Sequence, residues 1–148
     1  MEGSEFAECV AKRGLREMPV DPRVAHKELE EAALDLARAR ASLDSGSAGW
    51  AVVQSYYACF HAARALVLSR GYSEKSHRCL SIALRDLFER EGLLEKGSVD
   101  FLDGLRELRE EFNYALKQIS GVETAGIIED SRKFIVQAQT LLPDDEKK

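Results

Sequence analysis

The stretch WAVVQSYYACFHAARALVLSR, residues 50–70, constrains the fold more than any other part of the chain. It is apolar on nearly every side of a helix, and such a helix must pack against neighbours in several directions. We therefore expect a central helix, which the turn DSGSAG precedes and Gly71 ends. Hydrophobic residues make up 45% and charged residues 32% of the 148 positions, with 10 Gly and 3 Pro, which is typical of one mainly helical domain.

Four amphipathic segments are predicted to surround this central helix. The first begins at Pro22, behind Asp21 as its N-cap. Two more are expected over about 76–91 and 98–118, and the last follows the capping-box sequence SGVE and runs up to Pro143. Because the connections between these long helices are short, neighbours should run antiparallel. The expected fold class is all-α, an up-and-down antiparallel bundle of four to five helices.

The sequence divides into three parts. Residues 21–142 form the predicted bundle, and residues 143–148 read as a solvated tail. Residues 1–20 are expected to form an N-terminal arm or a short helix, which Gly14 weakens and Pro19 ends.

Charge, hydropathy and cysteine content narrow the classes of protein. No apolar run reaches the length of a membrane span, and the acidic N-terminus does not resemble a secretory signal. A net charge of −5 argues against coating of nucleic acid by bulk electrostatics, so RNA contact requires a local patch. Because Cys9, Cys59 and Cys79 are odd in number and form no CxxC, we expect reduced thiols and a cytoplasmic location.

Polar residues on the central helix follow a helical spacing. Gln54, Tyr57, His61 and Arg64 recur at three or four residues and so share one face. This face is compatible with half of a polar cleft that binds a nucleotide or RNA, with a hydrogen-bonded seam between helices, or with the solvent side.

The turn GYSEKSHRC is a second candidate site. Lys75, His77 and Arg78 surround a predicted helix start, with Ser73 or Ser76 as its cap. Free amide groups and the positive end of the helix dipole attract phosphate at such a position. Ordinary capping with exposed cations explains the same residues equally well.

Arg109 is the third candidate, and a purely structural role explains it less well than it explains the other two. At about 100° per residue it falls between Leu105, Phe112 and Leu116, inside the apolar stripe of its helix, with Asn113 one turn away. A buried ion pair with another helix would explain it, but such pairs stabilise little compared with apolar packing. A cleft or a subunit interface therefore explains Arg109 better.

Several chemistries lack their sequence signals. His26, His61 and His77 lie far apart, and the chain contains no HExxH, GxGxxG, P-loop or GxSxG motif. We therefore predict no metal site and no cofactor.

Three segments together resemble the HEPN domain family: QSYYACFHAARALVLSRGYSEKSH, LRELREEFNY and RKFIVQAQTLL. The resemblance spans residues 25–142 and is nearest to the small stand-alone prokaryotic members. It implies a helical bundle that commonly forms a homodimer, often encoded beside a minimal nucleotidyltransferase as a toxin–antitoxin-like pair. Active members resemble metal-independent ribonucleases that carry Arg, four to six intervening residues and then His.

The catalytic motif of the family is incomplete in this chain. Its Arg corresponds to Arg109, but Tyr114, preceded by Asn113, stands at the His position. A tyrosine with an ordinary pKa of about 10 is a poor general base. Tyr114 also lies roughly 140° around the helix from Arg109. A symmetric dimer would bring Arg109 of one chain near Asn113 or Tyr114 of the other.

Three functions follow as hypotheses. The first is a nucleotide- or RNA-binding protein that works with a nucleotidyltransferase and cleaves RNA weakly or not at all. The second is an active metal-independent ribonuclease in which Tyr114, His61 or His77 replaces the missing histidine. The third is a non-catalytic dimeric interaction module that Arg109 holds together.

Overall fold

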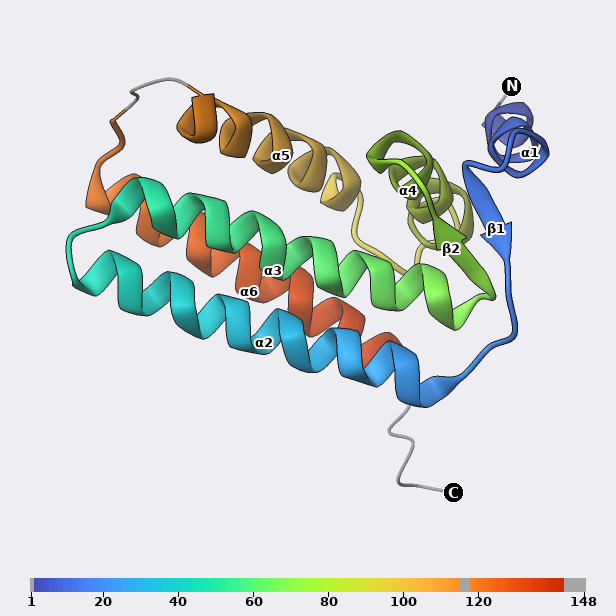
Figure 1. Ribbon diagram of the computed structural model, residues 1–148, viewed down its shortest axis with the longest axis horizontal. Coiled ribbons are helices and arrows are strands. Elements are labelled where there is room, and N and C mark those ends of the chain that lie inside the picture. The colour runs from blue at the N-terminus through green and yellow to red at the C-terminus, as the bar shows by residue number, and fades with distance from the viewer. Residues whose placement is uncertain (1, 115–117, 143–148) are drawn as a thin grey trace.

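The computed structural model describes residues 2–114 and 118–142, without the side chains of residues 2–4 and 113–114. The described part contains six α-helices, one π-helical segment and two short strands, so the predicted all-α class is confirmed. Helix α3 (Ala48–Ser69) lies in the middle, with α2 (Pro22–Asp44), α5 (Ser98–Tyr114) and α6 (Gly121–Leu141) packed around it (Figure 1). More than half of its 22 residues are buried, which confirms the predicted central helix.

The four long helices alternate in direction along the chain, as an up-and-down bundle requires (Figure 1). The side chain of Asp21 caps α2 by accepting from the backbone N–H of Arg23. At the start of α6, Ser120 and Glu123 form the predicted capping box. These local signals place both helix starts where the sequence puts them.

The segment predicted as one α-helix over 76–91 changes its winding halfway. Helix α4 (His77–Leu84) starts at Ser76, whose side chain accepts from the N–H of Cys79, and it continues as the π-helix η1 (Arg85–Glu89). Hydrophobic spacing does not distinguish the two windings over so few residues. Such π-helical turns frequently occur at functional sites, because the extra residue re-aims the side chains around it.

The N-terminal arm docks at one end of the bundle. Helix α1 (Glu2–Ala11) is followed by strand β1 (Leu15–Glu17), which pairs antiparallel with β2 (Tyr72–Glu74) before α4. The predicted tail, residues 143–148, lies outside the described residues.

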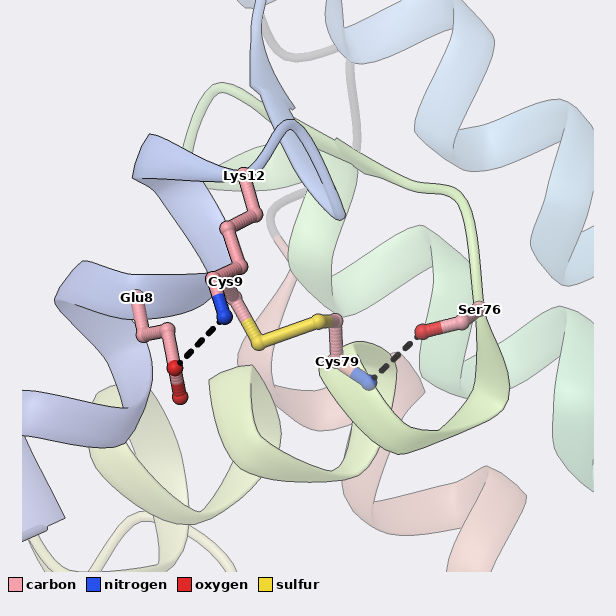
Figure 2. The surroundings of a disulfide bond; sticks show 5 residues. All are labelled: Glu8, Cys9, Lys12, Ser76 and Cys79. Carbon is pink, nitrogen blue, oxygen red and sulfur yellow. Dashed lines mark hydrogen bonds and ion pairs between the residues drawn. A yellow bond between two sulfur atoms is a disulfide. The ribbon is translucent and has the colours of Figure 1, made fainter.

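The cysteines correct one expectation. Cys9 of α1 and Cys79 of α4 form a disulfide, so the prediction of three reduced thiols is wrong for these two residues (Figure 2). They are 70 positions apart, and no sequence spacing indicates the pairing. Cys59 is a free, fully buried thiol, and burial raises its pKa to about 12.

Among residues 2–114 and 118–142, none of the helices has the length and apolarity that crossing a membrane requires.

Candidate functional site

Arg109 extends from α5 towards α3. Its Nη1 donates to the hydroxyl of Tyr57 at 3.0 Å, and its Nη2 lies 3.6 Å from Glu110 Oε2. The Arg109 side chain is 17% exposed, whereas that of Glu110 is 43% exposed. An ion pair with so exposed a partner is weak, so within residues 2–114 and 118–142 the guanidinium is neither free in bulk water nor neutralised by a buried acid.

The guanidinium of Arg109 contacts two aromatic rings of α3. The Arg109 Cζ lies 5.0 Å from the ring centroid of Tyr56 and 5.6 Å from that of Tyr57. Both distances are typical of cation–π contacts. The Nε of Arg109 is buried and has no hydrogen-bond acceptor among the residues that the structure describes. This arrangement holds the cation in place and leaves part of its donor capacity unused.

Tyr56 links Arg109 to a histidine on another helix. Its hydroxyl lies 3.1 Å from Nδ1 of His77. Burial raises the pKa of Tyr56 to about 12, so the hydroxyl stays protonated near neutral pH. On the opposite side of the imidazole ring, His77 Nε2 lies 2.9 Å from Asp103 Oδ1.

Asp103 orients the histidine. It also accepts from Ser81 Oγ at 2.5 Å and from Arg85 Nη2 at 2.9 Å. Burial alone would raise the pKa of Asp103, but the hydrogen bonds from His77 and Ser81 bring it below its ordinary value. The ionised carboxylate therefore accepts from Nε2–H of His77. When the imidazole is neutral, its Nδ1 is then free to accept a hydrogen bond from the Tyr56 hydroxyl.

A cavity of about 370 Å³ opens beside this network, between α4, η1 and α5. His77, Ser81 and Asp103 contribute to its wall, and Glu5 of α1 reaches its rim. The remaining charges come from α4, η1 and α5. In total the wall carries three arginines and three acids, namely Arg78, Arg85, Arg106, Glu5, Asp103 and Glu107. Its charge is therefore balanced, unlike that of the acidic chain as a whole.

Three of the polar residues predicted along α3 contact three different neighbouring elements. Tyr57 contacts Arg109, whereas His61 and Arg64 turn towards acids of α2 and β2. His61 Nδ1 lies 2.6 Å from Glu28, and this hydrogen bond raises the pKa of His61. Arg64 donates to the buried Glu74 at 2.7 and 3.1 Å. Both side chains already have carboxylate partners within the chain.

The other predicted site residues lie around the start of α4 and on α5. His77 joins the network, and Arg78 is exposed on the cavity wall. Lys75 is exposed just before α4, and its backbone N–H donates to Gly14. Asn113 and Tyr114 belong to α5, but their side chains lie outside the described residues.

Sequence reasoning missed Tyr56, Ser81, Arg85 and Asp103. Ser81 follows His77 by one helical turn and so carries a weak local signal, whereas Asp103 lies six residues before Arg109, a spacing that does not place the two on one face. Their convergence depends on how α3, α4 and α5 pack, which spacing within one helix does not reveal.

Comparisons with known proteins agree on the fold. A model of the HEPN domain family matches residues 25–139. A protein from Archaeoglobus fulgidus, described as a UPF0332 protein, is 33% identical over 86 residues, which are 57% of this chain and 68% of that protein. The crystal structure of TT1696 from Thermus thermophilus superposes with a TM-score of 0.66 at 20% identity, over 78% of this chain and 96% of that one. At that identity the likeness shows the fold alone.

Proposed function

Because the chain belongs to the HEPN domain family, whose function is in general related to nucleotides or RNA, we propose that it binds single-stranded RNA or a nucleotide at Arg109. The observation that carries the proposal is the Arg109 guanidinium, held on the rings of Tyr56 and Tyr57 without a buried acid beside it. A cation fixed in this way matches a phosphate, which accepts hydrogen bonds from several guanidinium N–H groups at once.

The neighbouring side chains suit a single strand better than a duplex. Tyr57 is 38% exposed, so a face of its ring is available for an unpaired base. Arg106 lies three residues before Arg109, on the same side of α5, and its side chain is 40% exposed. One arginine would hold a phosphate beside the stacked base while the other meets the next phosphate of the strand.

The partners are proposed from family resemblance. We propose a homodimer that works with a minimal nucleotidyltransferase in a toxin–antitoxin-like pair and cleaves RNA weakly or not at all. Support for weak cleavage comes from Tyr114, which stands where active members carry histidine. Dimerisation through α5 would place Asn113 and Tyr114 of one chain beside Arg109 of the other.

Fluorescence anisotropy with a labelled single-stranded RNA and with free nucleotides tests the binding site. Arg109→Ala should weaken binding by about 10- to 100-fold, because it removes a charged hydrogen-bond donor to phosphate. Arg132→Ala is the matched control, since Arg132 is an exposed arginine of α6 that pairs with Glu129. Equal binding by wild type and Arg109→Ala would contradict the proposed site.

The His77 geometry favours a second candidate, an active metal-independent ribonuclease. Asp103 orients His77 through Nε2, as general-base histidines require, and Tyr56 occupies Nδ1. In cleavage, a ribose 2′-hydroxyl would displace Tyr56, pass its proton to Nδ1 and attack the adjacent phosphorus. Arg109 would stabilise the charge that develops on the phosphate, and the bond from phosphorus to the 5′-oxygen would break as that oxygen takes a proton from solvent; protonated His77 would then return its proton to solvent.

Incubation of chelator-treated protein with RNA separates binding from cleavage. Products with 2′,3′-cyclic phosphate ends that disappear in His77→Asn would establish cleavage through His77. Loss in Tyr114→Phe or His61→Gln instead would assign the reaction to those residues. Intact RNA would reject cleavage and leave the binding proposal in place. If Arg109→Leu changes the oligomer on sizing without changing affinity, the chain is an interaction module.

A further inference from the structure

We propose that the Cys9–Cys79 disulfide is a thiol–disulfide exchange site, and that its reduction by a dithiol releases α1 from the rim of the cavity beside His77. The exchange site stands on the disulfide and its surroundings alone. Its effect on ligand binding rests on the function proposed above.

The disulfide links the N-terminal arm to the bundle covalently, in addition to the backbone that joins them. Cys9 lies on α1 and Cys79 is the third residue of α4, with their Cα atoms 5.8 Å apart (Figure 2). Gly14 makes room for the bridge, because a Cβ there would lie 2.5 Å from Cys79 Sγ. The Gly14 N–H also donates to the carbonyl of Cys9 at 2.7 Å, which folds the end of α1 back onto the bond.

A cavity of about 300 Å³ reaches the disulfide, although Cys9 and Cys79 are themselves only 2% and 6% exposed. Both cysteines line it, together with Gly14, the acid Glu8 and the basic residues Lys12 and Arg78. Lys12 lies 3.0 Å from Glu8, and Arg78 is exposed at the start of α4. Two basic residues against one acid leave this wall with one excess positive charge, which attracts the anionic thiolate that performs the exchange.

The chemistry favours attack on Cys9. The thiolate of the reductant bonds to Cys9 Sγ, the Cys9–Cys79 bond breaks, and Cys79 leaves as a thiolate. The N-terminus of α4, where the Cys79 N–H is bound to Ser76, and nearby Arg78 stabilise this leaving group. The first step leaves a mixed disulfide between the reductant and Cys9. The second thiol of the dithiol then attacks the reductant sulfur of this mixed disulfide and releases Cys9 as a thiolate. Two electrons pass to the protein, both cysteines take up protons, and the reductant becomes a disulfide.

Reduction leaves α1 held by the backbone and by non-covalent contacts alone, in which Cys9 lies in the core and Phe6 and Val10 pack against it. Its Phe6 packs edge-on against Tyr72, with ring centroids 5.3 Å apart, and α1 otherwise contacts α4, η1 and β1. The family match begins at residue 25, so α1 lies outside the matched part of the chain. Where a protein works in a reducing compartment, its disulfides are typically transient and redox-sensing.

Release of α1 changes the charge of the cavity beside His77. With α1 in place, three arginines face three acids, and one of those acids is Glu5. Departure of Glu5 leaves an excess of one positive charge on the wall. A single unit charge at about 7 Å in water changes anion affinity by on the order of threefold, so reduced protein should bind RNA more tightly.

Thiol counting and hydrogen exchange test the exchange site on the full chain. Denatured, untreated protein should react with a thiol reagent at Cys59 alone, and dithiothreitol treatment should expose all three cysteines. After reduction, amide exchange in residues 2–11 should accelerate at least tenfold, while α3 is unchanged. Cys9→Ser should reproduce this acceleration without reductant, and Cys59→Ala, still sensitive to reductant, is the control. Three reactive thiols in untreated protein, or unchanged exchange in residues 2–11, would overturn the proposal.

RNA binding by oxidised and reduced protein tests the consequence. We expect affinity for a labelled single-stranded RNA to rise about threefold on reduction, and Glu5→Gln to give the same rise without reductant. If neither state binds RNA but α1 is released, the proposed function fails and the exchange site stands. If RNA binds equally in both states while α1 is released, the inferred control of the cavity is wrong.

Discussion

Replacement of Arg109 by leucine separates a structural arginine from a functional one. The substitution removes the hydrogen bond to Tyr57, worth about 0.5–1.5 kcal/mol, and the cation–π contacts, worth roughly 0.5–2 kcal/mol. It also removes the buried Nε–H that has no acceptor, which costs the native state about 1–3 kcal/mol. Losses and gains are of similar size, so Arg109→Leu should change the free energy of unfolding by less than about 1.5 kcal/mol.

Urea unfolding followed by far-UV circular dichroism measures this change. Leu105→Ala is the reference, because Leu105 lies on the same helix, is 3% exposed, and should lose about 2–5 kcal/mol. The melting temperature of Arg109→Leu should stay within about 5 °C of wild type. A loss as large as that of Leu105→Ala, together with unchanged RNA binding, would show that Arg109 serves the fold and refute the reasoning.

Three further outcomes are expected. The hydrogen bond with Glu28 raises the pKa of His61 above 6.5. The stabilisation that His61 gives the fold is therefore full below pH 6.5 and is lost as the pH rises through the raised pKa. In a plot of the urea unfolding midpoint against pH, His61→Gln should flatten the curve over this range. The lowered pKa of Asp103 stabilises the fold above its ordinary value of 3.8, and this is lost as the pH falls through the lowered value. Asp103→Asn should make that acid limb shallower, because Glu8, Asp21 and Glu129 also have lowered pKa values, whereas a limb unchanged in the variant would contradict the assignment. Gly14→Ala, whose Cβ would press on Cys79, should increase the fraction of reduced cysteines in a dithiothreitol titration. Unchanged thiol counts would show that the bridge tolerates the extra carbon.

The bundle was predictable because its signals are local. Pro22 behind Asp21, the capping box at Ser120, and Gly71 with a φ of +85° each act within one turn of chain. The apolar circumference of α3 predicts neighbours on several sides, and α2, α5 and α6 supply them. The same helical spacing placed Arg109 on the buried side of α5, where it rests on Tyr56 and Tyr57.

The site was less predictable because its residues meet only through tertiary packing. Tyr56, His77 and Asp103 come from three helices. No characteristic spacing in the sequence predicts either of the two hydrogen bonds between them. The π-helix has the same difficulty, since a five-residue change of winding barely alters the hydrophobic pattern. The Cys9–Cys79 bridge depends on β1 pairing with β2, which brings the arm beside α4.

The most direct test of the proposed function is the side-chain Nε–Hε resonance of Arg109 in ¹H–¹⁵N NMR spectra. Its Nε is buried, so the proton should exchange slowly enough to be observed. As single-stranded RNA is added, we expect this resonance to shift in proportion to the bound fraction, while that of Arg132 on α6 stays in place. RNA that saturates the protein without moving the Arg109 resonance would contradict the claim that phosphate is bound there.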